Sequence, residues 1–166
     1  MRLSPNVLFV EDDADTRELM AIILKSQDYQ VMLAANYEEA LLLARVMRFD
    51  LFIMDNWMPG GSGIELCRKL REFDVTTPII FYSGAAYECD KREAFASGAQ
   101  AYLTKPTDTD TLIETVARLI AEARKIPTPA RAVTLDAVGH KPLPPPPFTN
   151  LFCAFCAFLW LLPTTA

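Results

Sequence analysis

The 166-residue sequence predicts an α/β fold with a doubly wound, five-stranded parallel sheet and helices on both of its faces. Short apolar runs alternate five times with longer amphipathic segments in the first 125 residues, which is the pattern of successive β–α units. The apolar runs lack polar alternation, as expected for parallel strands buried on both sides. With 51% hydrophobic and 22% charged residues, the chain can bury the core that such a sheet requires.

The first unit combines the apolar run Val7-Leu8-Phe9-Val10 with a helix expected at 15–26. Its apolar residues should form one helical stripe facing the sheet: Leu19, Met20, Ile22 and Ile23. Asp15, with Glu18 three residues later, resembles a capping box and predicts that the helix begins there.

The other four units follow in the same order. The expected strands are 30–35, 51–54, 78–82 and 100–103, and the expected helices are 37–47, 64–73, 87–97 and 108–125. Gly98 should end the helix 87–97, because glycine is the usual residue with positive φ after a helix. The crossovers between parallel strands should be right-handed.

Composition divides the chain near residue 126. Eight of the 12 prolines follow that point, including the run 144–147, and the charged residues there are Arg131, Asp136 and Lys141. The sequence therefore predicts a domain at 4–124, a proline-rich and disordered linker at 126–150, and a short apolar tail at 151–166, and the first 125 residues carry a net charge of −6.

The apolar run 151–162 in the tail is too short for a membrane span as a helix, at roughly 18 Å against a hydrocarbon core of about 30 Å. Contact with a membrane surface, a docking or oligomerisation role, and no selected role are alternatives for it. Cys153 and Cys156 have no second cysteine pair and fit an apolar role better than a metal or redox role.

The acidic balance argues against nucleic acid as a partner. Four cysteines, one histidine and no signal-peptide pattern at the start predict a cytoplasmic protein with reduced thiols. The glycine-rich stretch 60–63 lacks the Gly-Lys-Ser/Thr ending of a phosphate-binding loop, so no nucleotide cofactor is expected.

Charged or hydroxyl side chains follow four of the five expected strands. Glu11 and Asp12 follow the first, Asp55 the third, Ser83 the fourth and Lys105 the fifth. Sites in open parallel sheets lie at the carboxyl ends of the strands, so these residues should converge. Clustered carboxylate oxygens favour Mg²⁺, and a carboxylate beside it can attack phosphorus. We therefore expect phosphoryl transfer to Asp55, with Lys105 and Ser83 contacting phosphoryl oxygens.

These residues lie in segments that resemble the receiver domain of two-component response regulators, the CheY-like superfamily. The segments are 7–13, 55–63 (which matches the pattern D-x-x-M-P-x-x-x-G), 83–85 and 102–106. The resemblance covers residues 4–124 and implies the strand order 2-1-3-4-5 of flavodoxin-like sheets, an order for which a receiver domain is a standard example.

The resemblance implies roles for individual residues. Asp55 would take a phosphoryl group from the phosphohistidine of a sensor kinase or a phosphotransfer protein. Mg²⁺ would be held by Asp12, Asp55 and the backbone carbonyl of Trp57, with Glu11 acting through a water. Ser83 and Tyr102 would form the switch, and the Lys105–Pro106 peptide bond is often cis in such domains. The bulky Trp57 leaves the phosphoryl lifetime open.

The 41 residues after Lys125 show no helix-turn-helix pattern, so we expect a phosphorelay protein that signals by protein contact, without a DNA-binding output domain, through an unknown target. It would be no enzyme beyond its own phosphorylation and dephosphorylation. Two alternatives stay open: a Mg²⁺-dependent phosphatase with Asp55 as nucleophile, and a protein-interaction module whose apolar tail is the functional part.

Overall fold

The computed structural model describes residues 4–84, 87–106 and 109–125. All of them lie in the first of two units into which the chain divides, Met1–Pro129. The predicted linker, which contains the one histidine of the chain (His140), and the apolar tail with its two cysteines lie outside the described residues.

Five parallel strands form one sheet in the order β2-β1-β3-β6-β7, which is the predicted order 2-1-3-4-5. The strands are β1 (Asn6–Val10), β2 (Gln30–Ala34), β3 (Leu51–Met54), β6 (Ile79–Ser83) and β7 (Ala101–Thr104). Each agrees with its predicted range to within one residue at either end.

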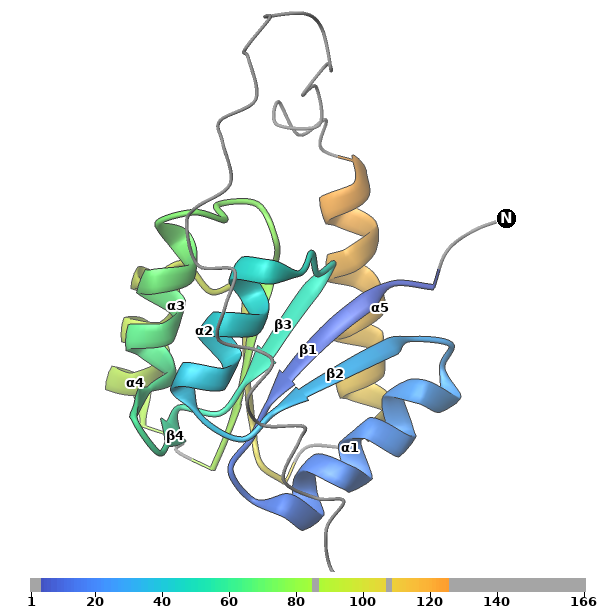
Figure 1. The fold of residues 1–166 in the computed structure, drawn as a ribbon, viewed down its shortest axis with the longest axis horizontal. Helices are drawn as coiled ribbons and strands as arrows, with labels where there is room; N and C mark the ends of the chain where they lie inside the picture. Colours follow the sequence, from blue (N-terminus) through green and yellow to red (C-terminus); the bar gives the residue numbers. More distant parts are fainter. Residues whose placement is uncertain (1–3, 85–86, 107–108, 126–166) are drawn as a thin grey trace, which may run out of the picture. The chain divides into compact units, whose positions relative to one another are not determined.

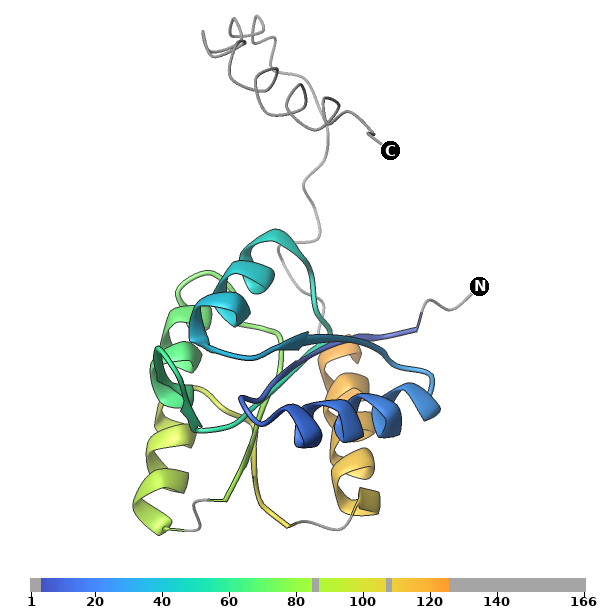
Figure 2. The same cartoon turned by 60° about the horizontal axis from the view of Figure 1, so that its bottom comes forward.

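The helices are α1 (Ala14–Ser26), α2 (Tyr37–Val46), α3 (Gly63–Arg71), α4 (Glu88–Ala96) and α5 (Thr109–Lys125). Helices α2, α3 and α4 cover one face of the sheet, and α1 and α5 cover the other (Figures 1 and 2). The doubly wound arrangement predicted from the alternating pattern is therefore confirmed.

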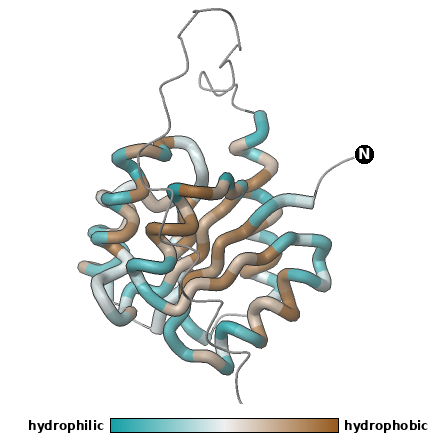
Figure 3. Tube along the Cα trace, in the orientation of Figure 1, coloured by the Kyte–Doolittle hydropathy of each residue, from teal (hydrophilic) through white to brown (hydrophobic). Residues whose placement is uncertain are grey.

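The core consists of two layers because successive residues of a strand point to opposite faces of the sheet. In β3, Phe52 and Met54 pack in the layer under α2, α3 and α4, whereas Leu51 and Ile53 pack in the layer under α1 and α5. The central strands β1, β3 and β6 are hydrophobic along most of their length, as the brown segments of Figure 3 show. This double burial explains the continuous apolar runs in the sequence.

The predicted stripe of α1 is wrong in part. Leu19 and Ile22 are 57% and 67% exposed, and the buried residues of the helix are Met20, Ala21 and Leu24. The capping-box prediction is also wrong, because the N-cap is Asp13, whose carboxylate accepts the Thr16 N–H over 2.8 Å. The helix thus begins one residue earlier than predicted, and its buried face is rotated toward Leu24.

A two-stranded antiparallel hairpin, β4 (Trp57–Met58) with β5 (Gly61–Ser62), was not predicted. Gly60 turns the chain between the two strands with φ of +87°, a conformation that few side chains tolerate. The hairpin shapes the loop that follows Asp55. Gly98 ends the α4 segment with φ of +109°, as the sequence predicted.

Candidate functional site

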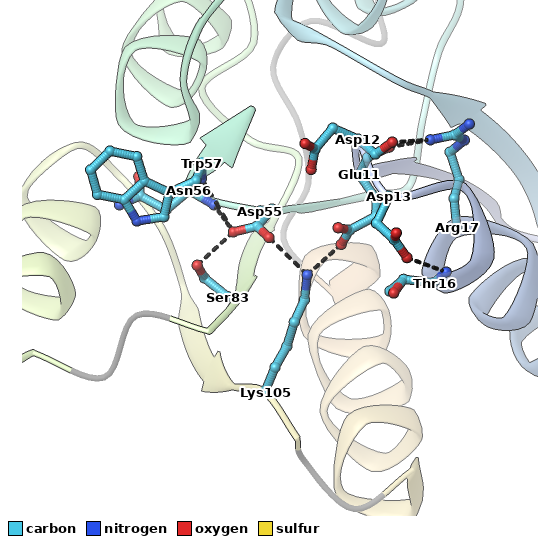
Figure 4. A network of polar contacts seen from close by, with 10 residues as sticks. All are labelled: Glu11, Asp12, Asp13, Thr16, Arg17, Asp55, Asn56, Trp57, Ser83 and Lys105. Carbon is cyan, nitrogen blue, oxygen red and sulfur yellow. Dashed lines mark hydrogen bonds and ion pairs between the residues drawn. The ribbon is translucent and has the colours of Figure 1, made fainter. Parts of the chain in front are cut away.

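The site residues come together because the strands that carry them are neighbours in register. Val10 pairs with Met54, so the next residues, Glu11 and Asp55, lie side by side at the carboxyl edge of the sheet. Ser83 pairs with Thr104 on the adjacent strands, which brings Lys105 to the same edge. Figure 4 shows the side chains of Glu11, Asp55, Ser83 and Lys105 pointing toward one another.

The two carboxylate oxygens of Asp55 have different partners. Oδ1 accepts the Ser83 hydroxyl and the Asn56 N–H, each over 2.5 Å, and the Trp57 N–H over 3.2 Å. Oδ2 accepts the Lys105 ammonium over 2.8 Å. Asp55 is 9% exposed and Ser83 is fully buried, so the carboxylate is fixed in orientation yet reaches the surface.

Lys105 bridges the two buried carboxylates. Its ammonium forms ion pairs with Asp55 and with Glu11, which is 3% exposed. Burial by itself would lower the pKa of Lys105, but hydrogen bonds to Asp55 and Glu11 outweigh it and raise that pKa. Burial raises the pKa of Glu11, although Lys105 opposes this shift. Lys105 therefore stays protonated and neutralises part of the acidic site.

The loop after β1 is held by two contacts that keep its carboxylates in place. Arg17 donates from one nitrogen to the backbone carbonyls of Glu11 and Asp12, over 2.6 and 3.0 Å. The hydrogen bond with Thr16, which fixes the cap of α1, lowers the pKa of Asp13. Asp13 is thus engaged with the helix, whereas the exposed Asp12 is left facing the site (Figure 4). Sequence reasoning missed Arg17, whose one-turn spacing after Asp13 was the available signal.

The loop after β3 approaches so closely that it needs glycine at residue 63. A Cβ on Gly63 would lie 2.3 Å from the Asp55 carbonyl oxygen. The Gly63 N–H donates to the Asn56 carbonyl over 2.9 Å. The helix α3 then begins with a capping box between Ser62 and Glu65. The close contact explains the glycine at the end of the segment 55–63.

The acidic side chains fit a hard divalent cation. Glu11, Asp12 and Asp55 each offer a carboxylate oxygen, and these oxygens lie within 4.8 Å of one another. An all-oxygen set, open to solvent on the Asp12 side, suits Mg²⁺, which keeps several waters when bound to protein. The three carboxylates predicted to surround Mg²⁺ are therefore brought together.

Tyr102 links the site to the sheet. Its ring stacks on Phe81 with centroids 5.8 Å apart and planes 4° apart, and it lies on β7 three residues before Lys105. Burial raises the pKa of Tyr102, against a hydrogen bond with Ser83 that lowers it. Ser83, which contacts Asp55, is therefore also in contact with Tyr102. The Lys105–Pro106 peptide bond is cis.

The fold and the site define the class: a CheY-like α/β domain with an acidic cluster and a lysine at the carboxyl edge of its sheet. Residues 7–117 match the response regulator receiver domain. The chain belongs to this family, whose members are phosphorylation-switched signalling domains of two-component systems.

Known proteins agree with this assignment. The cell cycle transcriptional regulator CtrA of Caulobacter vibrioides is 35% identical over 127 residues, which cover 76% of this chain and 54% of CtrA. The chain thus spans about half the length of that relative.

No helix among the described residues is long and apolar enough to cross a membrane.

Solved structures share the fold. A CheY-like receiver domain protein from Methanospirillum hungatei superposes with a TM-score of 0.71 and 27% identity, over 74% of this chain and 98% of that one. TrrA from Thermotoga maritima, solved in complex with Mg²⁺ and BeF, has a TM-score of 0.65 and 31% identity, over 69% and 98% of the two chains.

Proposed function

We propose that Asp55 accepts a phosphoryl group from a phosphohistidine of a histidine kinase or a phosphotransfer protein. The observation that carries the proposal is the convergence on Asp55 of one ammonium, one hydroxyl and two further carboxylates. A carboxylate oxygen of Asp55 attacks phosphorus, the P–N bond to the imidazole breaks, and its electron pair stays on the nitrogen. The product is an acyl phosphate on Asp55.

Each neighbouring residue has a role in this reaction. Asp12 and Asp55, with the backbone carbonyl of Trp57, are the proposed direct ligands of Mg²⁺, and Glu11 acts through a water. Bound Mg²⁺ supplies positive charge that lets an anionic phosphoryl group approach the carboxylates. The Lys105 ammonium and the Ser83 hydroxyl would donate to phosphoryl oxygens, a role supported by the hydrogen bonds that both donate to Asp55.

We propose that phosphorylation of Asp55 signals by shifting the domain between two arrangements of Ser83 and Tyr102. A phosphoryl group that draws on the Ser83 hydroxyl changes the partner of Tyr102, and the altered surface is recognised by another protein. We propose that the output is contact with another protein. To move the ratio of the signalling to the resting arrangement from 1:99 to 99:1, the phosphoryl group would have to stabilise the signalling arrangement by about 5.5 kcal/mol more than the resting one.

Incubation of the full chain with phosphoramidate or acetyl phosphate and Mg²⁺ tests the proposal by intact mass. We expect a gain of one phosphoryl group that disappears in Asp55→Asn and persists in the matched variant Asp28→Asn, whose carboxylate lies in the exposed turn before β2. Multiple turnover on a phosphate ester such as p-nitrophenyl phosphate would indicate a phosphatase instead. Absence of both reactions would favour an interaction module.

A further inference from the structure

A pocket lies beside the acidic site, between α3 and α4. It has a volume of about 280 Å³, and its lining includes one buried amide, one aromatic ring and four charged side chains, those of Asn56, Trp57, Glu65, Arg68, Asp90 and Glu93, beside Ser62 and Ile64. We call it the α3–α4 pocket. We propose that it binds an arginine side chain presented by a partner protein.

The buried wall of the pocket offers an acceptor without a donor. Asn56 is 5% exposed, and its Oδ1 has no hydrogen-bond partner among the described residues. A buried acceptor left unpaired costs about 1–3 kcal/mol, so a water or a ligand N–H is expected at this atom. The α3–α4 pocket therefore favours a hydrogen-bond donor.

The charge of the pocket favours a cation. Three carboxylates face one guanidinium, and two of these carboxylates already have partners. Glu65 accepts from Ser62 in the cap of α3, and Glu93 pairs with Arg68 over 2.9 Å. Asp90 makes a 3.9 Å contact with the Cys89 thiol but no salt bridge with any described residue. A cationic donor would satisfy Asp90 and Asn56 together.

Arginine fits this set better than lysine does. Its planar guanidinium carries five N–H donors, enough for a carboxylate and an amide oxygen at once. The Trp57 side chain, 69% exposed at the rim, offers a flat face on which a guanidinium can stack. A lysine ammonium has no such plane.

The occupant should belong to a protein. The volume lies just below the roughly 300–1,000 Å³ of small-molecule pockets, so it is suited to one side chain. Tyr87, the N-cap of α4 one turn before Asp90, is 73% exposed, and with Trp57 it provides apolar surface that a docking protein would cover. The pocket does not depend on phosphorylation, so the unphosphorylated chain tests it.

The experiment is a titration of the ¹⁵N-labelled full chain with N-acetyl-L-argininamide, followed by NMR at the Asn56 side-chain amide and the Trp57 indole N–H. We expect saturable shifts at both groups. The neutral isostere N-acetyl-L-citrullinamide should bind about two- to fivefold more weakly, the range expected of an exposed ion pair. N-acetyl-L-lysinamide should leave the indole resonance nearly unchanged.

Variants separate this site from general surface attraction. Asp90→Asn should weaken arginine binding about two- to fivefold, and Asp28→Asn, on the opposite edge of the sheet, should leave it unchanged. Equal affinity in Asp90→Asn and the unaltered chain, or shifts spread without saturation over the surface, would overturn the proposal. If free arginine bound more tightly than N-acetyl-L-argininamide, the inference that the arginine belongs to a protein would be wrong.

Discussion

Ser83 donates its hydroxyl to Oδ1 of Asp55 over 2.5 Å, while both residues are buried at the ends of adjacent strands. The same oxygen accepts two backbone N–H groups, whereas Lys105 holds the other oxygen. The carboxylate is therefore oriented before any ligand arrives. This fixed orientation makes the roles of its neighbours separable by mutation.

Replacement of Lys105 by alanine should leave two neighbouring carboxylates repelling each other. Glu11 and Asp55 would lose the ammonium that bridges them, so we expect a loss of about 2 kcal/mol in the free energy of unfolding without Mg²⁺. Mg²⁺ should still bind and should raise the melting temperature more than in the unaltered chain, but phosphorylation should be transmitted poorly. Lys69→Ala, which removes an exposed pair with Glu72, should show neither effect. Equal melting curves for both variants would contradict the bridging role.

Ser83→Ala should uncouple Asp55 from Tyr102. Removal of a hydrogen bond to a charged acceptor should cost about 1.5 kcal/mol, and the shift of Tyr102 NMR signals on addition of Mg²⁺ and beryllofluoride should become smaller. Ser97→Ala is the matched control, because it removes a buried hydroxyl that donates to the neutral Ala94 carbonyl over 2.7 Å. A full Tyr102 response in Ser83→Ala would show that the switch follows another route.

The residue pattern was sufficient for the five β–α units and for polar residues at the strand ends, whereas the strand order that brings those residues together came from the resemblance to receiver domains. Asp55, Ser83 and Lys105 meet at one edge as predicted. The sequence was not sufficient where two residues compete for one role, as at the cap of α1, where Asp13 and not Asp15 accepts the Thr16 N–H. Nor does periodicity show which apolar residues of a helix stay exposed, as Leu19 does.

Contacts between distant segments were also beyond the sequence. The hairpin after Asp55 depends on Gly60 and on the Tyr37 N–H, which donates to the Pro59 carbonyl over 3.2 Å. Local propensity does not encode such contacts, because they form only after the sheet has brought the segments together.

Trp57→Ala tests whether the indole shields the acyl phosphate from water. In Figure 4 the indole points away from the Asp55 carboxylate, and its side chain is 69% exposed. We therefore expect the rate of phosphoryl loss, followed by intact mass after removal of the phosphodonor, to change by less than about threefold, or under 1 kcal/mol in the barrier. A tenfold faster loss would show that the ring swings over the phosphoryl group.

Acid should remove one specific contribution to stability, that of Asp74. Burial opposes ionisation of this carboxyl, but hydrogen bonds from Thr77 and Thr76 and the charge of Arg71 prevail and lower its pKa below 3.8. Its charged form therefore stabilises the folded state above pH 3.8, and this contribution is lost as the pH falls through the folded pKa. Asp74→Asn should be less stable than the unaltered chain by about 1 kcal/mol or less at pH 7, and the difference should shrink as the pH falls below 3.8. Urea unfolding at pH 7, 5 and 2 measures this, and a difference that grows on acidification would contradict the assigned sign.

Deletion of residues 127–166 should leave phosphorylation intact. The residues of the proposed site and both layers of the core lie between Val7 and Ile120, so the contacts that position Asp55 are contained in the described domain. The shortened chain should take up one phosphoryl group at an unchanged rate and keep its melting temperature within a few degrees, which corresponds to less than about 0.5 kcal/mol. A chain cut after residue 112 is the control, because it loses Val116, Leu119 and Ile120 from the core and should unfold. Loss of phosphorylation in the 1–126 chain would mean that the segment after α5 contributes to the fold or to the site.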